Sequence, residues 1–420
     1  MRIAVILLSL GIMCGGAGCA KRPHTTITTS DNQLHTGIWR LEMDLGEAKL
    51  PFNFELEREE KNGNGYFYAT IINGKEKIKT LPFHLTDSDS IYFKMPVFDC
   101  AFEGKRTGPG EFSGVWANYS KSKNYRIPFV ARSGETYRFA EGKSTLNVSG
   151  KWEVTFSKNT PDEYKAVGLF EQTGTKVTGT FLTETGDYRY LEGNVNGNEM
   201  NLSCFDGSHA FLFTSFKNES GDLIGTFYSG NHWKDNWVAV RNESFELTHP
   251  DSLTFMKDGF ESISFSFPDL SGNTVSFPSE KYDGKVVIIQ IMGSWCPNCM
   301  DETRLLTEFH KKYNARGLEV ISLCFERSSD FNVASANVKL HQSHLGASYD
   351  FLICGPASKE SAAKALPMLN HVMSFPTSIF IDKKGKVRKI HTGFYGPGTG
   401  GYYYNFVDKT SSFIEKLLVE

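Results

Sequence analysis

Two cysteines separated by two residues, Cys296 and Cys299, stand between a strand-like run and a helix-like run. The apolar run 286–292 precedes them, and apolar residues at helical spacing, such as Leu305 and Phe309, follow them. This order places Cys296 at a helix N-terminus, where free backbone N–H groups and the helix dipole favour a thiolate. Cys299 then lies one helical turn further along, close enough to resolve a mixed disulfide. The pattern predicts dithiol–disulfide exchange.

The length and composition of the chain limit the possible folds and partners. A chain of 420 residues is too long for one typical core, so we expect two or three domains. The net charge is −3, and no long basic run is present, which argues against nucleic acid as a main partner. Aromatic residues make up 13% of the chain, which favours β-rich globular structure over disorder.

The first residues are typical of an export signal. Arg2 precedes an apolar run, 3–13, that is too short to span a bilayer. Small residues then lead to Cys19, and this stretch resembles the signal of bacterial lipoproteins, although Gly16 stands where Leu is usual. We therefore expect a signal peptide at 1–19 and a lipidated Cys19. An ordinary signal peptide is the alternative.

A lipidated Cys19 would anchor the protein to a membrane through its acyl chains. The polar stretch 20–34 would then be a tether, with the protein in the cell envelope and facing the periplasm.

Residues 35–245 contain an internal repeat. Thr36-Gly37-Ile38-Trp39 recurs as Ser149-Gly150-Lys151-Trp152, so that the two tryptophans are 113 positions apart. The stretch around Gly114 recurs around Gly225, 111 positions later. Near-constant offsets at both ends indicate two copies of about 110 residues. We place the two copies at 35–134 and 147–245.

Each copy has the pattern of an antiparallel β-meander. Turn pairs such as Asn62-Gly63 and Asn196-Gly197 separate short runs that alternate apolar and polar residues. We expect an all-β region with about eight strands in each copy, arranged as a barrel or as a sandwich. One larger sheet shared by both copies is a further alternative. A ligand pocket inside such a barrel is possible, but a Trp on the first strand more often fills the core.

The pattern changes after a linker at 246–264. From Phe265 onward strands alternate with helices, which predicts a mixed-sheet α/β domain over 265–420. The strands are expected at 286–292, 318–325, 349–354, 377–382 and 387–392. The helices are expected at 297–314, about 330–342, 358–366 and 405–418.

This last domain resembles the TlpA-like thioredoxin-fold proteins, which are exported and often membrane-anchored thiol–disulfide oxidoreductases. The resemblance rests on the run from Gly284 to Cys299, on Glu302, and on Ser374-Phe375-Pro376-Thr377 before a strand that ends at Asp382. It covers about residues 265–420 and implies a thioredoxin-like fold there. It says little about the duplicated β region.

The resemblance also implies roles for single residues. Cys296 would be the attacking thiolate and Cys299 the resolving thiol. Pro376 would be a cis-proline packed against them, and the backbone of Phe375 would pair with a substrate peptide. Trp295 would cover the cysteines and bind substrate with Phe375. A trans-proline at the start of an edge strand is the alternative for Pro376.

Glu302 lies one helical turn beyond Cys299 and is the candidate proton shuttle. A carboxylate exposed to solvent in the first helix is the alternative. Family members usually have Pro two residues after this Glu, whereas this chain has Arg304.

The leading hypothesis is a lipid-anchored oxidoreductase, more often a reductase in this family, that acts on protein thiols and disulfides. An upstream membrane electron donor would be its second partner, and no cofactor or metal is implied. A zinc site would need a second Cys/His pair, and none follows Cys299 at ligand spacing. A peroxiredoxin would have a lone cysteine preceded by Thr, unlike Cys296. The serious alternative is a lipoprotein whose β region binds a ligand or partner.

Overall fold

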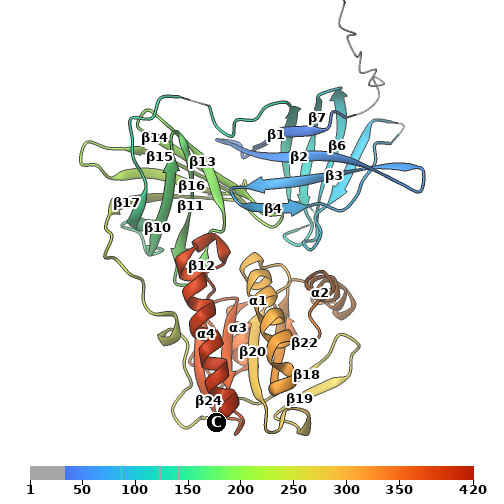
Figure 1. The fold of residues 1–420 in the computed structure, drawn as a ribbon, viewed down its shortest axis with the longest axis vertical. Coiled ribbons are helices and arrows are strands. Elements are labelled where there is room, and N and C mark those ends of the chain that lie inside the picture. The colour runs from blue at the N-terminus through green and yellow to red at the C-terminus, as the bar shows by residue number, and fades with distance from the viewer. Residues whose placement is uncertain (1–33, 87, 123, 141) are drawn as a thin grey trace, which may run out of the picture. The chain divides into compact units, whose positions relative to one another are not determined.

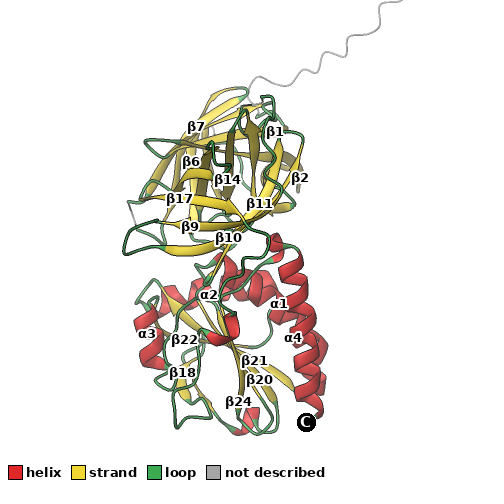
Figure 2. Cartoon of the chain, turned by 90° about the vertical axis from the view of Figure 1, so that its left-hand side faces the viewer, coloured by secondary structure: helices red, strands yellow, loops and turns green. Residues whose placement is uncertain are grey.

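The computed structural model describes residues 34–420, except for residues 87, 123 and 141. These residues form one compact unit, with an all-β part and a part that contains the α-helices (Figures 1 and 2). The predicted signal and Cys19 lie outside the described residues. Within the described part, none of the helices combines the length and the apolar character that crossing a bilayer requires.

The first copy of the repeat forms an antiparallel sheet in the order β4-β3-β2-β1-β8-β7-β6-β5. Its strands are β1 (Gly37–Asp44), β2 (Lys49–Lys61), β3 (Asn64–Asn73), β4 (Glu76–Lys79), β5 (Ser90–Lys94), β6 (Cys100–Gly108), β7 (Glu111–Asn118) and β8 (Arg126–Ser133). The edge strands β4 and β5 do not pair, so this sheet is an open barrel. One backbone hydrogen bond, from Leu81 N–H to the Lys94 carbonyl at 3.0 Å, crosses the gap beside them.

The second copy forms a closed barrel in which β10 pairs with both β9 and β11. Its strands are β9 (Gly150–Phe156), β10 (Tyr164–Thr173), β11 (Lys176–Thr183), β13 (Leu191–Asn196), β14 (Glu199–Phe205), β15 (Ala210–Lys217), β16 (Leu223–Ser229) and β17 (Trp233–Arg241), with the short β12 (Gly186–Asp187) attached to β11. The predicted fold class of two repeated meanders followed by an α/β domain is therefore confirmed. The second copy is a closed barrel and not a sandwich.

The two copies share a buried tryptophan with the same local contact. The indole N–H of Trp39 donates to the carbonyl of His35 at 2.8 Å, and that of Trp152 donates to the carbonyl of Val148 at 2.9 Å. Both tryptophans are almost completely buried in the cores of their sheets. Equivalent contacts at an offset of 113 positions support the duplication.

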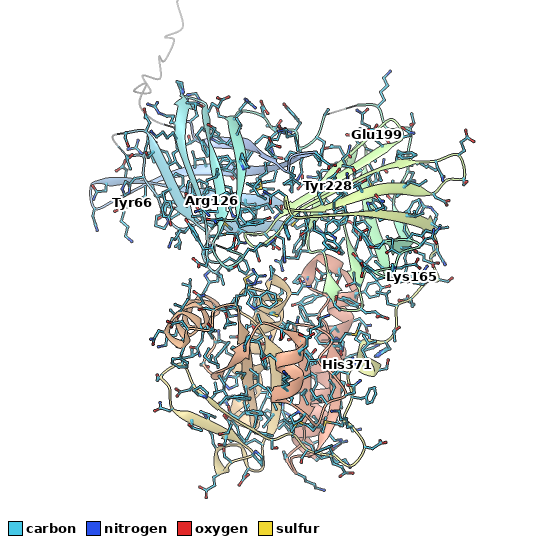
Figure 3. The ribbon with its side chains drawn as sticks, turned by 180° about the vertical axis from the view of Figure 1, so that it is seen from behind. Tyr66, Arg126, Lys165, Glu199, Tyr228 and His371 are labelled. Carbon is cyan, nitrogen blue, oxygen red and sulfur yellow. The ribbon has the colours of Figure 1, made fainter. Side chains whose placement is uncertain are left out.

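Aromatic side chains fill both β cores. The second barrel is packed with rings from its own strands, among them Phe156, Phe181 and Phe213. The open first barrel instead takes a ring from the other copy, because Phe205 of β14 lies in its core. Tyr228 of β16 also packs against this core (Figure 3).

The α/β part contains a five-stranded sheet in the order β22-β21-β20-β23-β24 and a separate hairpin, β18–β19. The strands are β18 (Phe265–Pro268), β19 (Thr274–Phe277), β20 (Val286–Met292), β21 (Leu318–Glu326), β22 (Asp350–Pro356), β23 (Thr377–Ile381) and β24 (Val387–Thr392). The helices are α1 (Pro297–Tyr313), α2 (Phe331–Leu345), α3 (Lys359–Ala365) and α4 (Gly401–Val419). Strand β20 is parallel to β21 and antiparallel to β23, as expected for a mixed sheet.

Strand β20 is buried on both faces, so its alternate residues enter two different cores. Val286 and Ile288 pack with residues of α1, α2 and α4, whereas Val287 and Ile289 pack with residues of α3 and the β18–β19 hairpin. Figure 2 shows α1 and α4 on one side of the sheet and α3 on the other. A strand covered on both faces has a nearly continuous apolar run, which Gln290 interrupts here.

The segment 246–264, the predicted linker, lies along the α/β part. Lys257 N–H donates to the carbonyl of Met368 at 2.8 Å, and His391 Nδ1 is 2.6 Å from Asp251 Oδ1. Ile263 is buried in the core on the α3 side of the sheet. The linker is therefore packed onto the domain that follows it.

Replacing Phe205 tests whether the first barrel depends on the second. The ring of Phe205 stacks on Phe52 at 4.8 Å and meets Trp116 edge to face at 5.1 Å. Because Phe205→Ala would leave a cavity in a packed aromatic core, we expect a loss of about 3–5 kcal/mol in the free energy of unfolding. Urea denaturation followed by tryptophan fluorescence measures this loss. The matched control is Phe216→Ala in the neighbouring strand, where the side chain is 47% exposed, and an equal loss in both variants would contradict the prediction.

Candidate active site

Cys296 is the N-cap residue of α1, as the strand–cysteine–helix order predicts. Its backbone is extended, with φ −104° and ψ 115°, and Pro297 occupies the first turn of the helix. The Cys296 sulfur accepts a hydrogen bond from the backbone N–H of Cys299 at 3.2 Å. The first turn of the helix therefore directs a backbone N–H at this sulfur.

The two cysteines differ in exposure. Cys296 is 7% exposed, whereas Cys299 is completely buried in the core beneath it. Burial, and then the adjacent Cys296, raise the pKa of the Cys299 thiol well above its usual value. Of the two cysteines, Cys296 alone retains some exposure to solvent, and the attacking and resolving roles stay predictions.

The Phe375–Pro376 peptide bond is cis and lies against the outer cysteine. The Cys296 sulfur is 3.5 Å from the carbonyl oxygen of Phe375. Thr377 holds the turn, because its hydroxyl donates to the carbonyl of Ser374 at 2.8 Å. Among the described residues the backbone N–H of Phe375 has no hydrogen-bond partner. The edge next to Cys296 is therefore free for a strand-like substrate segment.

Trp295 forms a wall beside Cys296. Its ring meets that of Phe375 at 5.8 Å in an edge-to-face arrangement, and its indole N–H donates to the carbonyl of Phe325 at 2.9 Å. A side chain at Gly293 would lie 2.2 Å from the indole nitrogen, so glycine is required for this approach. Trp295 and Phe375 thus surround the outer cysteine, and their role in substrate binding stays a prediction.

Glu302 is buried below the cysteines and is not exposed to solvent. The hydroxyl of Ser378 donates to one carboxylate oxygen and the amide of Gln290 to the other, both at 2.9 Å. Burial raises the pKa of Glu302 to about 7, although these two hydrogen bonds lower it. The Gln290 amide also donates to the carbonyl of Cys299 at 3.3 Å. A carboxyl group that titrates near neutral pH next to Cys299 can accept or return a proton.

A second buried carboxyl group, that of Glu326, was not identified from the sequence. It lies at the end of β21 and accepts hydrogen bonds from the backbone N–H of Ser294 at 2.8 Å and from the Ser294 hydroxyl at 2.7 Å. Burial raises the pKa of Glu326 to about 7. An acidic residue at the carboxyl end of a buried strand, next to the strand that carries the cysteines, is the signal that could have revealed it.

The β region contacts the cysteine loop directly, which sequence reasoning did not predict. Asn298, between the two cysteines, donates to the carbonyl of Asp187 at 3.2 Å. Ser374 donates to the carbonyl of Thr185 at 2.6 Å, and Ser208 donates to the carbonyl of Trp295 at 3.0 Å. Turns of the second barrel therefore hold both the cysteine loop and the cis-proline loop.

Arg189 is a deeply buried residue that links the β region to helix α1. Its guanidinium pairs with Asp301 in α1 and with Glu76 in β4, and it donates to the carbonyl of Pro297 at 3.2 Å. Asp206 lies 3.5 Å away from its Nε. Burial lowers the pKa of Arg189, but these three carboxylates and that of Asp187 raise it well above its usual value. The charge is therefore permanent and compensated on three sides.

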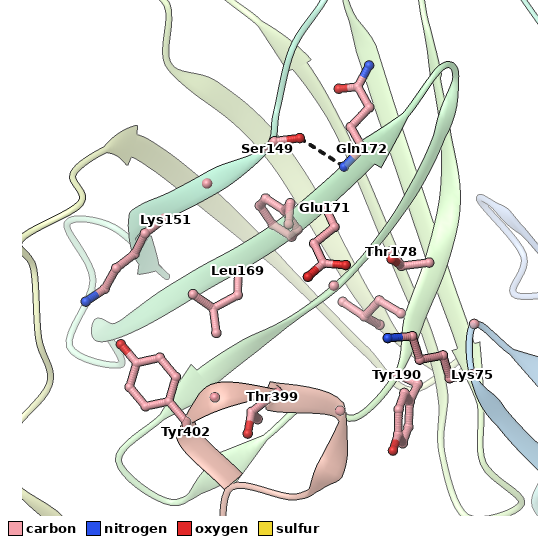
Figure 4. Close-up of a pocket in the computed structure, with 18 of the residues that line it drawn as sticks. Lys75, Ser149, Lys151, Leu169, Glu171, Gln172, Thr178, Tyr190, Thr399 and Tyr402 are labelled. Carbon is pink, nitrogen blue, oxygen red and sulfur yellow. Dashed lines mark hydrogen bonds between the residues drawn. The ribbon is translucent and has the colours of Figure 1, made fainter. Parts of the chain in front are cut away.

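The Gly-rich loop 393–401 faces the second barrel. Residues Pro397 to Gly401 line a cavity of about 1130 Å³ together with β10 and β11, and Lys151, Tyr190 and Tyr402 also border it (Figure 4). The lining residue Leu169 points outward from the barrel, whereas its neighbour Phe170 is in the barrel core. This space therefore lies outside the barrel and not within it.

The remaining cysteines of the described residues are part of packed cores. Cys100, Cys204 and Cys324 are fully buried, and Cys354 is half-buried on β22. Burial raises the pKa of each of these thiols. Within the described ranges, His, Cys, Asp and Glu side chains form no group that could hold a metal ion.

Comparisons with known proteins agree with this geometry. A sequence model of the Redoxin family matches residues 257–399. Thiol-disulfide oxidoreductase ResA of Bacillus thuringiensis (strain Al Hakam) is 30% identical over 132 residues, which are 31% of this chain and 68% of ResA. Thioredoxin-like protein YneN of Bacillus subtilis (strain 168) is 26% identical over 138 residues, 33% of this chain and 73% of YneN.

A solved thiol:disulfide interchange protein from Chlorobium tepidum TLS is 20% identical, with a TM-score of 0.30. The match covers 38% of this chain and 95% of that protein. The sequence matches confirm a TlpA-like oxidoreductase domain in the C-terminal part of the chain, after the β region. Through residues 257–399 the chain belongs to the Redoxin family of thiol–disulfide oxidoreductases.

Proposed function

We propose that this protein is a membrane-anchored thiol–disulfide oxidoreductase that faces the periplasm and reduces disulfides of other proteins. The observation that carries the proposal is the pairing of Cys296, at a helix N-terminus and 7% exposed, with a completely buried Cys299. The free edge at Phe375 is suited to an extended polypeptide, because backbone pairing there would place a substrate disulfide beside Cys296.

The reaction proceeds in two exchanges. The Cys296 thiolate attacks one sulfur of the substrate disulfide, which forms a mixed disulfide and releases the other sulfur as a thiolate that takes up a proton. Cys299 then loses its proton and attacks the Cys296 sulfur, which releases the second substrate thiol. The products are a reduced substrate and a Cys296–Cys299 disulfide, so two electrons have moved. A membrane electron donor upstream must return them.

Glu302 is the group suited to take the proton from Cys299. Its carboxyl group is buried and is connected to Cys299 through the amide of Gln290. Since its pKa lies near 7, the group is partly ionised at neutral pH and can both accept and return a proton.

Location and anchoring rest on the N-terminal sequence. Arg2, the apolar run 3–13 and the small residues before Cys19 support export followed by lipidation. An acyl anchor would keep the redox domain near a membrane donor, and the stretch 20–34 would act as the tether.

A second candidate function is capture of a ligand or partner by the β region. The cavity between β10, β11 and the Gly-rich loop is the observation that favours it (Figure 4). In that case the redox domain would be subsidiary, and the trapping experiment that follows would yield no mixed disulfide.

Replacing each cysteine separates the two exchanges. We expect Cys296→Ser to abolish disulfide reduction, and Cys299→Ser to accumulate mixed disulfides because the resolving thiol is lost. Mass spectrometry of proteins trapped in vivo by Cys299→Ser identifies the substrates, with the Cys296→Ser/Cys299→Ser double variant as control. Full activity of Cys296→Ser would overturn the mechanism, and absence of trapped proteins would favour the second candidate.

The pH dependence of stability tests the environment of Glu302. Its folded-state pKa of about 7 exceeds the ordinary value of 4.5, so the folded protein binds the proton more tightly and loses stability as the pH rises between these values. We expect Glu302→Gln to be more stable than the wild type by about 3 kcal/mol at pH 8 and by little at pH 4.

Urea denaturation across this pH range measures the difference, with Glu308→Gln on the exposed face of α1 as control. The rate of mixed-disulfide resolution should also lose its rise near pH 7 in Glu302→Gln. A gain in stability that does not change with pH would contradict the assignment.

Cys19→Ser tests the anchor. Because acylation needs the thiol, we expect the variant to move from the membrane fraction to the soluble fraction and to lose incorporated palmitate. Cell fractionation and metabolic labelling measure both effects, and Cys14→Ser is the matched control. Membrane association that persists in Cys19→Ser would exclude this lipid anchor.

A further inference from the structure

One basic side chain lies over the ring of Trp295, and a second follows the residue that this side chain contacts in the first barrel. Arg327 follows β21, and its guanidinium carbon is 4.7 Å from the centre of the Trp295 ring. Lys121 comes from the loop between β7 and β8, and His232 from the turn between β16 and β17. Burial, together with the charge of Lys121, lowers the pKa of His232 to about 4, so this imidazole is neutral at pH 7. We therefore call Arg327 and Lys121 the cationic rim, with His232 as a neutral neighbour of Lys121.

Direct contacts hold the rim together. Arg327 donates to the hydroxyl of Ser120 at 3.1 Å, which joins the redox domain to the first barrel. Lys121 Nζ is 3.4 Å from His232 Nε2, and the hydroxyl of Tyr125 is 3.1 Å from His232 Nδ1. The first and second barrels therefore meet at this point, beside the loop that carries Cys296.

The charges of the rim are not neutralised within the described part of the chain. Among the described residues, no carboxylate lies within 4.0 Å of Arg327 or Lys121. By contrast, Arg189 and Arg304 near the cysteines each form ion pairs. The two nearby acids are engaged elsewhere: Glu326 with Ser294, and Asp206 with Arg189 and His209. Burial, together with the charge of Arg327, lowers the pKa of Lys121 to about 8.

The rim lies next to the reacting sulfur. Trp295 precedes Cys296 directly, and the guanidinium of Arg327 lies over its ring. Burial lowers the pKa of Arg327. The other side of the cysteine loop is closed by the turn at 183–187, which contacts Asn298 and Ser374. A substrate segment that lies along Trp295 and Phe375 therefore passes the rim.

We propose that the cationic rim binds acidic residues that flank the disulfide of a polypeptide substrate, so that the β region selects substrates for the redox domain. This inference rests on the proposed exchange at Cys296 and names the class of substrate. Opposite charges at the border of a binding site increase the rate of association and discriminate against basic partners.

The test compares two synthetic peptides that each contain one intramolecular disulfide. They are alike except that Glu or Gln stands beside each cysteine, and a neutral dipyridyl disulfide serves as a third probe. Stopped-flow mixing with the reduced full-length protein gives the second-order rate constant for each. We expect the Glu peptide to react about tenfold faster than the Gln peptide at low salt, and this ratio to fall towards one as salt is raised.

Charge reversal assigns the effect to the rim. We expect Lys121→Glu/Arg327→Glu to remove or invert the ratio between the two peptides. Both side chains lie at the protein surface, at least in part, so the variant should fold, and the milder Lys121→Gln/Arg327→Gln should give an intermediate ratio. The matched control is Lys384→Glu, in the exposed turn at the end of β23 away from Pro376, and it should keep the wild-type ratio.

The outcomes separate this inference from the function on which it rests. Equal rates of the wild type with both peptides, or a ratio that the rim variants do not change, would overturn the inference alone. An equal slowing with all three probes in the rim variants would also overturn it, since the rim would then act on the Cys296 thiolate. No reaction with any probe would overturn the proposed exchange as well.

Discussion

The buried guanidinium of Arg189 is the interaction on which the arrangement of the active site depends. A buried charge is strongly unfavourable unless it is paired and hydrogen-bonded. Arg189 is paired through groups from three separate parts of the chain: Glu76 in the first barrel, Asp206 in the second, and Asp301 with the Pro297 carbonyl in α1. Its terminal nitrogens donate hydrogen bonds, whereas its Nε has only the ion pair with Asp206. The two barrels and the start of helix α1 must therefore come together for the charge to be compensated. Met300 in the same part of α1 adds to this contact, because it packs in the core of the first barrel.

This connection makes the cysteine loop part of an interface. The loop would be an exposed end of a small α/β domain if the β region were absent, but here Asn298 and Ser374 are bound to the turn at 183–187. Cys299 and Glu302 are enclosed below, where burial raises the pKa of both. The β region thus restricts the directions from which a disulfide can reach Cys296.

The sequence predicts the elements that depend on local patterns and misses the contacts between distant segments. The run 286–292 is a strand with the bounds expected, since six of its seven residues are apolar and Gln290 is the only polar one, a pattern typical of a strand covered on both faces. Helix α4 begins at Gly401, four residues before the expected start. Its first residues, glycine and three tyrosines, are weak helix formers, so the local pattern predicts a later start. The cysteines lie where the local motif predicts them, between a strand and a helix. The roles of Arg189 and Glu326 instead depend on contacts with residues that are distant in the sequence.

The duplication explains why such partners converge beside the cysteines. At the offset of the second half of the repeat, Lys121 corresponds to His232, and these two residues are in contact. The loops before β6 and before β15 also correspond, and they meet through the Cys100 thiol and the Gly207 carbonyl at 2.7 Å. Corresponding segments that face each other are the mark of a two-fold interface, in which each surface patch meets its own copy.

A redox domain placed at such a junction breaks the symmetry. It binds the first copy through Arg327 and Ser120, and the second through Trp295 and Ser208. The two contacts come from loops that do not correspond in the repeat, the β7–β8 loop of the first copy and the β14–β15 loop of the second. Lysine on one side and histidine on the other are free to differ because neither is needed to close a barrel, and a surface of this kind can acquire selectivity for substrates while the cysteine chemistry stays unchanged.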